Sequence, residues 1–109
     1  MRVSIASDTE LTPALVAELE RSEIKVEETY EQKDLTEQAF GLAELSIVIA
    51  LIKGAADLAR VLKGLLDRSS KNKQKVQIKT AFGSVTLELD KDLTIEELRQ
   101  KLEPLFGTN

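Results

Sequence analysis

The feature of this sequence that most constrains its fold is a proline-free stretch, residues 35–70, rich in Leu, Ala, Ile and Val. This pattern predicts one long helix over residues 35–70. With a rise of about 1.5 Å per residue, such a helix would be roughly 50 Å long. A globular chain of this size has a radius of gyration of about 13 Å. The helix would be too long for its own domain to cover, so we expect its apolar surface to bind another chain.

Within the predicted helix, residues 45–52 are apolar on nearly every side, which is typical of a helix that is buried on more than one side. We expect six residues to carry the contact with a partner: Leu45, Val48, Ile49, Ala50, Ile52 and Gly54. The small residues Ala50 and Gly54 favour the close approach of a second helix. A kink or break at Gly54, which would fold the helix back over the sheet, is the alternative interpretation.

Short alternating segments predict that a sheet accompanies this helix. Val3 and Ile5 alternate with polar residues and predict a strand, and residues 24–30 predict another. Between these two strands, Thr12 followed by Pro13 is typical of the start of a helix. A strand, a helix and a strand within about 30 residues is the spacing of a βαβ unit.

Residues 74–90 predict a β-hairpin, because apolar residues alternate on both sides of a turn that contains Gly83. Placing Ala81 opposite Ser84 sets Ile78 opposite Leu87 and Val76 opposite Leu89. The same pairing brings Lys75 opposite Asp90, an opposite-charge cross-strand pair of the kind that stabilises antiparallel strands.

A last helix is predicted over residues 95–105, where Thr94 and Glu97 have the spacing of a capping box. The order of elements is then β-α-β-α-β-β-α. We therefore predict a single domain, residues 1–109, of the α/β (α+β) class. It would hold a small four-stranded mixed sheet and one unusually long central helix.

The chain contains neither cysteine nor histidine, which excludes disulfides, thiolate chemistry and the usual tetrahedral zinc site. Its five glycines stand singly, so no glycine-rich phosphate loop occurs. We expect no catalytic residue, no cofactor and no metal. Ser7 and Asp8, at the end of the first strand, are the remaining candidates for a ligand site, although a turn and a helix cap are the favoured interpretation. An enzyme would need a ligand bound there.

The net charge is −4, yet a run of basic residues follows the apolar stretch. This basic patch consists of Arg68, Lys71, Lys73 and Lys75. Aromatic residues are scarce and do not interleave with the lysines, so we do not expect nucleic-acid binding. The apolar stretch is too short to span a membrane, but together with the patch it could lie on anionic lipid. We expect a cytoplasmic protein without a signal peptide, with peripheral membrane association as the alternative.

Part of the chain resembles a known hairpin and helix. The segment VQIKTAFGSVTLELDKDLTIEELRQKL, residues 76–102, resembles the first hairpin and helix of a ubiquitin-type β-grasp. It covers a quarter of the chain, the remaining strands of that family do not follow, and no diglycine ends the chain. We interpret this likeness as shared local physics.

Over nearly its whole length, the chain is similar to the effector-associated constant component one family of bacteria. The features that carry this resemblance are MRVSIA at the start, the acidic first half, the Ala/Gly/Leu-rich central helix ending in LKGLLDRSSKNK, the strand pair KVQIKT and VTLELD, and a final short amphipathic helix. The resemblance implies a non-catalytic partner of varied effectors, often protease-like, in prokaryotic defence or conflict systems. We therefore predict a non-enzymatic adaptor that self-associates or binds an effector protein through its long helix, with a peripheral membrane module as the alternative.

Overall fold

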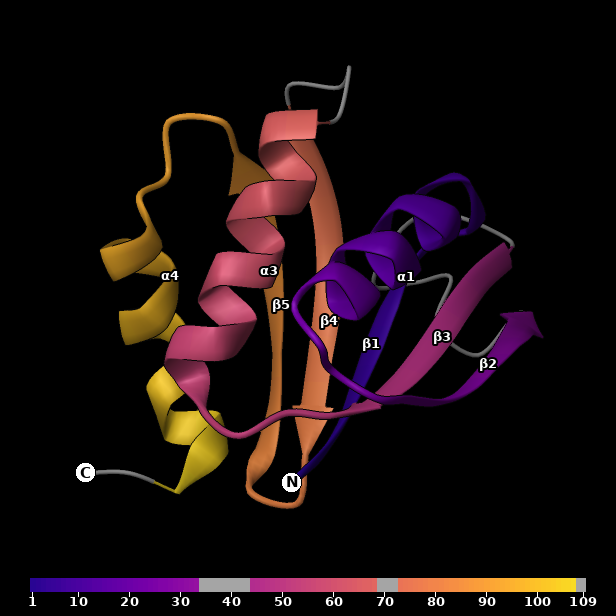
Figure 1. Ribbon diagram of the computed structural model, residues 1–109, viewed down its shortest axis with the longest axis horizontal. Coiled ribbons are helices and arrows are strands. Elements are labelled where there is room, and N and C mark those ends of the chain that lie inside the picture. Colours follow the sequence, from indigo (N-terminus) through magenta and orange to yellow (C-terminus); the bar gives the residue numbers. More distant parts are fainter. Residues whose placement is uncertain (34–43, 69–72, 108–109) are drawn as a thin grey trace.

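The computed structural model describes residues 1–33, 44–68 and 73–107. Its centre is a five-stranded sheet with helices packed on one face (Figure 1). The strands are β1 (Arg2–Asp8), β2 (Val26–Lys33), β3 (Glu44–Leu51), β4 (Lys73–Thr80) and β5 (Gly83–Asp90). The helices are α1 (Thr12–Arg21), α3 (Ala55–Arg68) and α4 (Ile95–Leu102), with the short 3-10 helices η1 (Thr9–Leu11) and η2 (Glu103–Phe106).

The strand order is β2-β3-β1-β4-β5, and every neighbouring pair is antiparallel. The expected α+β class is confirmed, whereas the four-stranded mixed sheet is wrong. Strands β1 and β2 run in the same direction, as the βαβ spacing suggested, but β3 lies between them and is antiparallel to both. Spacing along the sequence indicates the direction of two strands, but it does not show that a third strand will pair between them.

The long helix predicted over residues 35–70 is wrong. The part that the structure describes consists of strand β3 and helix α3, joined by residues 52–54; residues 34–43 lie outside the described chain. The run Ile47-Val48-Ile49 is β-branched, which favours a pleated strand over a helix. Both faces of this strand are covered, since Ile47 and Val48 are each buried. A strand buried on both faces shows no alternation, so it resembles a buried helix in sequence.

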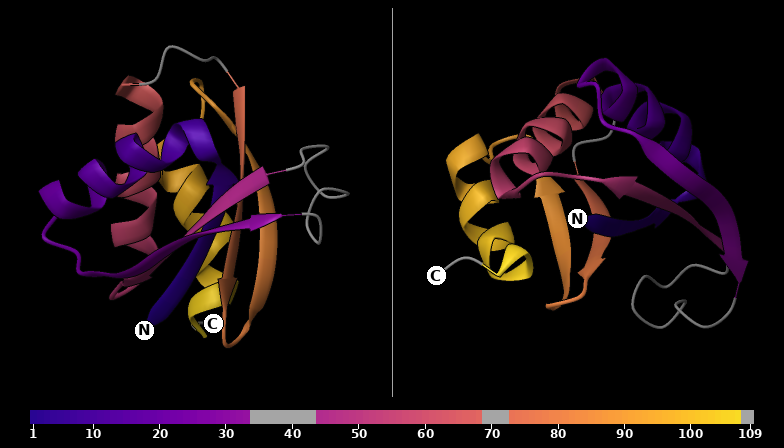
Figure 2. Two further views of the ribbon diagram at one scale, coloured as in Figure 1. Left: turned by 90° about the vertical axis from the view of Figure 1, so that its right-hand side faces the viewer. Right: turned by 60° about the horizontal axis from the view of Figure 1, so that its bottom comes forward.

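Gly54 lies in this connection, directly before α3 begins. The alternative interpretation, a kink or break of the helix at Gly54, gives the correct place for the reversal, but the segment before it is strand β3 and not a helix. Figure 2 shows α3 lying across the strands after this reversal.

The core lies between the helices and one face of the sheet, which we call the inner face. Strands β1, β3, β4 and β5 supply fully or nearly fully buried apolar side chains: Val3, Ile5, Val48, Ala50, Val76, Ile78, Leu87 and Leu89. Helix α3 buries its own apolar side against them through Leu58, Ala59, Val61, Leu62, Leu65 and Leu66. Strands β4 and β5 alternate between buried and more exposed positions, as a sheet covered on one face requires, whereas Ala6 of β1 and Ile47 of β3 are buried on the other face as well.

A buried carboxylate joins α1 to α3. Glu18 of α1 is 7% exposed and accepts hydrogen bonds from Arg21, at 2.6 Å, and from Arg68 at the end of α3. The carboxylate lies against Gly64, where an added Cβ would be 2.4 Å from Glu18 Oε2. Glycine at this position lets the acid lie against the helix backbone, and two arginines offset its buried charge.

The predicted hairpin is confirmed, but the predicted register is wrong by two residues. Ile78 pairs with Val85 and Val76 with Leu87, and the two-residue turn is closed by Thr80 and Gly83. Gly83 has a φ of +145°, which a residue with a side chain rarely adopts. Because the shift is even, each side chain stays on the face expected from its alternation.

Both expected helix starts are present. At α4, the Thr94 side chain accepts from the Glu97 backbone and the Glu97 side chain accepts from the Thr94 backbone, which confirms the capping box. At α1, Pro13 lies in the first turn as expected. Within the described residues, no helix is long and apolar enough to cross a membrane.

Candidate functional site

The structure separates the six residues that were expected to form an interface. Val48, Ala50 and Ile52 are buried in the chain's own core, so this fold does not present them to a partner. Gly54 lies in the connection before α3, and Leu45 belongs to β3. Ile49 differs from its neighbours because it is half-buried and faces away from the helices.

The residues of the basic patch do not form one surface where the structure describes them. Arg68 ends α3 and is paired with Glu18 in the helix layer. Lys75 is exposed on β4, on the face turned away from the helices. Lys73 is the first residue of β4, and Lys71 lies outside the described residues.

The expected cap is confirmed at Asp8, whereas the expected turn at Ser7 is wrong because Ser7 pairs within strand β1. Ser7 is completely buried on the inner face of β1. The side chain of Asp8 caps η1, accepting a hydrogen bond of 3.1 Å from the backbone N–H of Glu10. These contacts account for both residues without a ligand.

The largest surface that the described helices leave uncovered is the other side of the sheet, which we call the outer face. Cross-strand pairing assigns its side chains. They are Glu28 and Tyr30 on β2; Ile47, Ile49 and Leu51 on β3; Arg2, Ser4 and Ala6 on β1; Lys75, Gln77 and Lys79 on β4; and Ser84, Thr86 and Glu88 on β5. The left view of Figure 2 shows the sheet from its side, with all three helices packed against the inner face.

The outer face has an apolar strand next to a strand of small residues. On β3, Ile49 is half-buried and Leu51 is 38% exposed. On β1, Ser4 pairs with Ile49 and Arg2 with Leu51, and a hollow of about 230 Å³ opens beside the small Ser4 side chain. Six residues line this hollow: Arg2, Val3, Ser4, Ile49, Lys79 and Thr80. Apolar side chains beside a shallow hollow are typical of a surface that receives another protein.

Charges of both signs border this apolar strand. Arg2 Nε donates to Glu27 Oε1 at 2.9 Å, and because β3 lies between their strands, this ion pair crosses the outer face. Glu28 on β2 and Lys79 on β4 are exposed and, within the described chain, take part in no ion pair. The outer face therefore offers opposite charges on opposite sides of an apolar centre.

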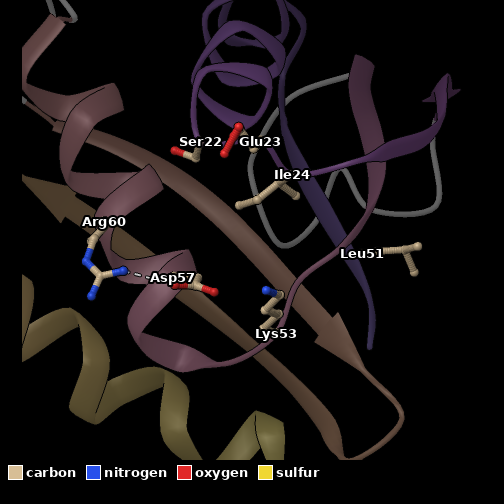
Figure 3. A pocket seen from close by; sticks show the side chains of 7 residues that line it. All are labelled: Ser22, Glu23, Ile24, Leu51, Lys53, Asp57 and Arg60. Carbon is tan, nitrogen blue, oxygen red and sulfur yellow. Dashed lines mark hydrogen bonds and ion pairs between the residues drawn. The ribbon is translucent and has the colours of Figure 1, made fainter.

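A second hollow, of about 520 Å³, lies where the turn after α1 faces the start of α3 (Figure 3). Its lining residues are Ser22, Glu23, Ile24, Leu51, Lys53, Asp57 and Arg60. Arg60 donates to Asp57 at 2.9 Å. Figure 3 shows that Leu51, which comes from the end of β3, points away from the other side chains.

This hollow does not assemble a reactive group. Its polar side chains are mostly exposed, and the charge of Arg60 is already balanced by Asp57. Glu23 adopts a φ of +61°, but it does so as the left-handed residue that ends α1, with the Ile24 N–H bonded to Leu19 O. Among the described residues, no group of three or more potential ligands could hold a metal ion.

The sequence contained part of the signal for the outer face. The alternation of Val3 and Ile5 already placed Arg2 and Ser4 on the opposite side of β1, and the hairpin pattern did the same for Lys75 and Lys79. Strand β3 gave no such signal because it is apolar on both faces. Its outer residue Ile49 was expected to contact a partner, but as part of a helix.

Comparison with models of known protein families gave no match for this chain, and comparisons with curated proteins and with solved structures likewise gave none.

Proposed function

We propose that this chain is a non-enzymatic interaction protein that binds a protein partner through the outer face of its sheet. The observation that carries the proposal is the partly exposed apolar surface of this face: on β3, Ile47 is buried, Ile49 is half-buried and Leu51 is 38% exposed, and Tyr30 on β2 is 44% exposed. Apolar side chains that neighbour one another on an exposed surface are stabilised when a partner removes them from water.

The charge of the outer face favours a protein partner over an anionic membrane. The cations Arg2, Lys75 and Lys79 are accompanied by carboxylates such as Glu27, Glu28 and Glu88. Attraction to anionic lipid requires an excess of positive charge, whereas a mixture of signs suits a partner with a complementary mixture.

The biological setting that we propose comes from the resemblance of the sequence pattern to the effector-associated constant component one family, for which the comparison with family models gave no match. The chain would act in the cytoplasm as a non-catalytic component of a prokaryotic defence or conflict system, in which effectors are often protease-like. The long helix has no part in this proposal, since residues 44–51 form strand β3.

A photo-crosslinking experiment tests the proposal with two exposed aromatic residues. Tyr30 lies on the outer face, and Phe82, which is 61% exposed, lies in the turn between β4 and β5. Each is replaced in turn by p-benzoylphenylalanine in the cells that naturally produce the chain. We expect a protein adduct from position 30 that is lost when Ile49→Asp is also present, and we expect no adduct from position 82.

Mass spectrometry of the adduct identifies the partner, which is either a second copy of this chain or a different protein. If position 30 yields no more adduct than position 82, the outer face is not the binding surface, and the proposed function is wrong.

A further inference from the structure

We propose that the outer face binds a second copy of this chain. The two sheets would pack face to face about a two-fold axis that runs parallel to the strands, between β3 and β1. The inference rests on the proposed function and names the partner of the same surface. Three observations support it: the shape of the outer face, the row in which its charges lie, and the mismatch that other axes produce.

The shape of the outer face is complementary to itself. The axis places β3 of each copy over β1 of the other, because these strands are equally distant from it. Ile49 then faces Ser4 of the second copy, where the hollow of about 230 Å³ lies. Ile47 and Ala6, in the neighbouring row, are already buried within one chain and add no contact between copies. In the Ile49 row, a larger side chain of one copy therefore meets a small one of the other, as close packing of two sheets requires.

The charges of the outer face lie in one row across the sheet. Glu28 pairs with Ile49, Ile49 with Ser4, and Ser4 with Lys79. Glu28 and Lys79 are three strand spacings apart, roughly 14 Å at about 4.8 Å per spacing, so they are too distant to pair within one chain. The axis exchanges β2 and β4 without moving residues along the strands. Glu28 of each copy is thus brought over Lys79 of the other, which forms two equivalent ion pairs.

Other two-fold axes do not bring opposite charges, or larger and smaller side chains, opposite each other. An axis perpendicular to the strands places β2 over β2 and β4 over β4, so that acidic residues face acidic residues and lysines face lysines. An axis through the centre of β3 sets the side chains of Ile49 from both copies against each other and leaves the hollow at Ser4 unfilled. Like charges that face each other across an interface oppose association.

The size of the surface indicates how tightly the copies bind. Four strands about 4.8 Å apart, with seven residues of about 3.4 Å each, cover roughly 19 by 24 Å, or at most on the order of 450 Å² per copy, since Ile47 and Ala6 are already buried. Stable specific interfaces bury about 800 Å² per partner, and transient ones bury less. We therefore expect a reversible dimer with a dissociation constant in the micromolar range.

Charge reversal with sedimentation equilibrium tests the arrangement. Glu28→Lys and Lys79→Glu each place two like-charged pairs in the homodimer, so each should weaken association at least tenfold (about 1.4 kcal/mol). The double variant Glu28→Lys/Lys79→Glu should dimerise as the wild type does. An equal mixture of the two single variants should form a heterodimer, because every facing pair in it is again of opposite sign.

Lys101 provides the matched control, since it is an exposed lysine on α4, on the helix side of the molecule. Lys101→Glu should leave the dissociation constant unchanged. Circular dichroism of each variant shows whether it remains folded, and the heterodimer arm requires both single variants to be folded.

Three results would overturn the inference. A wild type that stays monomeric at millimolar concentration, while position 30 crosslinks a different protein, refutes the second copy as partner and leaves the proposed function standing. Failure of the mixed single variants to associate refutes the two-fold arrangement. A monomer that gives no adduct at position 30 but binds vesicles of phosphatidylserine refutes both the inference and the proposed function.

Discussion

The two faces of the sheet are built from the same strands and differ in what their side chains do. Val48 and Ile49 are neighbours in β3, yet Val48 is completely buried beneath the helices while Ile49 faces the uncovered side. Side chains alternate between faces along a strand, so each strand contributes to the core at one position and to the surface at the next. Stability is thereby concentrated on the inner face, and binding can be altered on the outer face without loss of the fold.

The largest expected effect comes from comparing an aspartate on the inner face with an aspartate at the neighbouring position on the outer face. Val48→Asp buries a carboxylate without a partner and should cost about 4 kcal/mol or more, a large share of the total stability of about 5–15 kcal/mol that is typical of a domain. Ile49→Asp should cost about 1 kcal/mol or less and keep the fold. Urea unfolding followed by circular dichroism measures both, and equal losses would show that the faces do not differ as described.

Truncation should sharpen the same contrast at a smaller scale. Leu62 of α3 is completely buried against the inner face, whereas Leu51 is 38% exposed at the end of β3. Leu62→Ala should destabilise the domain by about 2–5 kcal/mol through the cavity that it leaves. Leu51→Ala removes the same atoms from a site in contact with water, and we expect about 1 kcal/mol or less. Thermal unfolding of the two variants compares them directly.

The parts of the fold that could be predicted are those where a local sequence pattern is compatible with only one structure. The capping box of Thr94 and Glu97 specified the start of α4, and the hairpin alternation specified which side of β4 and β5 is buried. The register failed because both pairings put the same side chains on the same faces, so only the turn that Gly83 permits distinguishes them.

The structure of the central stretch could not be predicted because its sequence pattern is compatible with both a helix and a strand. Ile47, Val48 and Ile49 form a run that is apolar on every side, and either a buried helix or a strand covered on both faces satisfies it. Their β-branched side chains favoured the strand, but the absence of proline favoured a continuous helix. The candidate site depended on this choice, since the outer face exists only when β3 is part of the sheet.

A smaller effect is expected at the junction within the helix layer, where Glu18 lies against Gly64. Alanine at position 64 gains about 1 kcal/mol of helix propensity, but its Cβ would displace the carboxylate that binds Arg21 and Arg68. In a double-mutant cycle, Gly64→Ala should be about 1 kcal/mol more favourable in a Glu18→Ala background than in the wild type. Urea unfolding of the four proteins gives this coupling, and a value of zero would mean that the two residues do not constrain each other.

The smallest effect on stability is expected on the outer face itself. The ion pair of Arg2 and Glu27 is solvent-exposed, and pairs of this kind contribute about 0–1 kcal/mol. Arg2→Ala should therefore change the free energy of unfolding by less than about 0.5 kcal/mol, as measured in urea. A loss of several kcal/mol would show that this ion pair stabilises the fold, which would contradict the difference between the two faces.

The most direct test of the central claim is a dilution series of the wild-type chain followed by amide nuclear magnetic resonance. If the outer face binds a second copy, the amide signals that move with concentration should be those of outer-face residues such as Ser4, Glu28, Ile49 and Lys79, while those of Lys63 and Lys101 in the helix layer stay fixed. Concentration-dependent shifts confined to the helix layer, or none at millimolar concentration, would contradict the account.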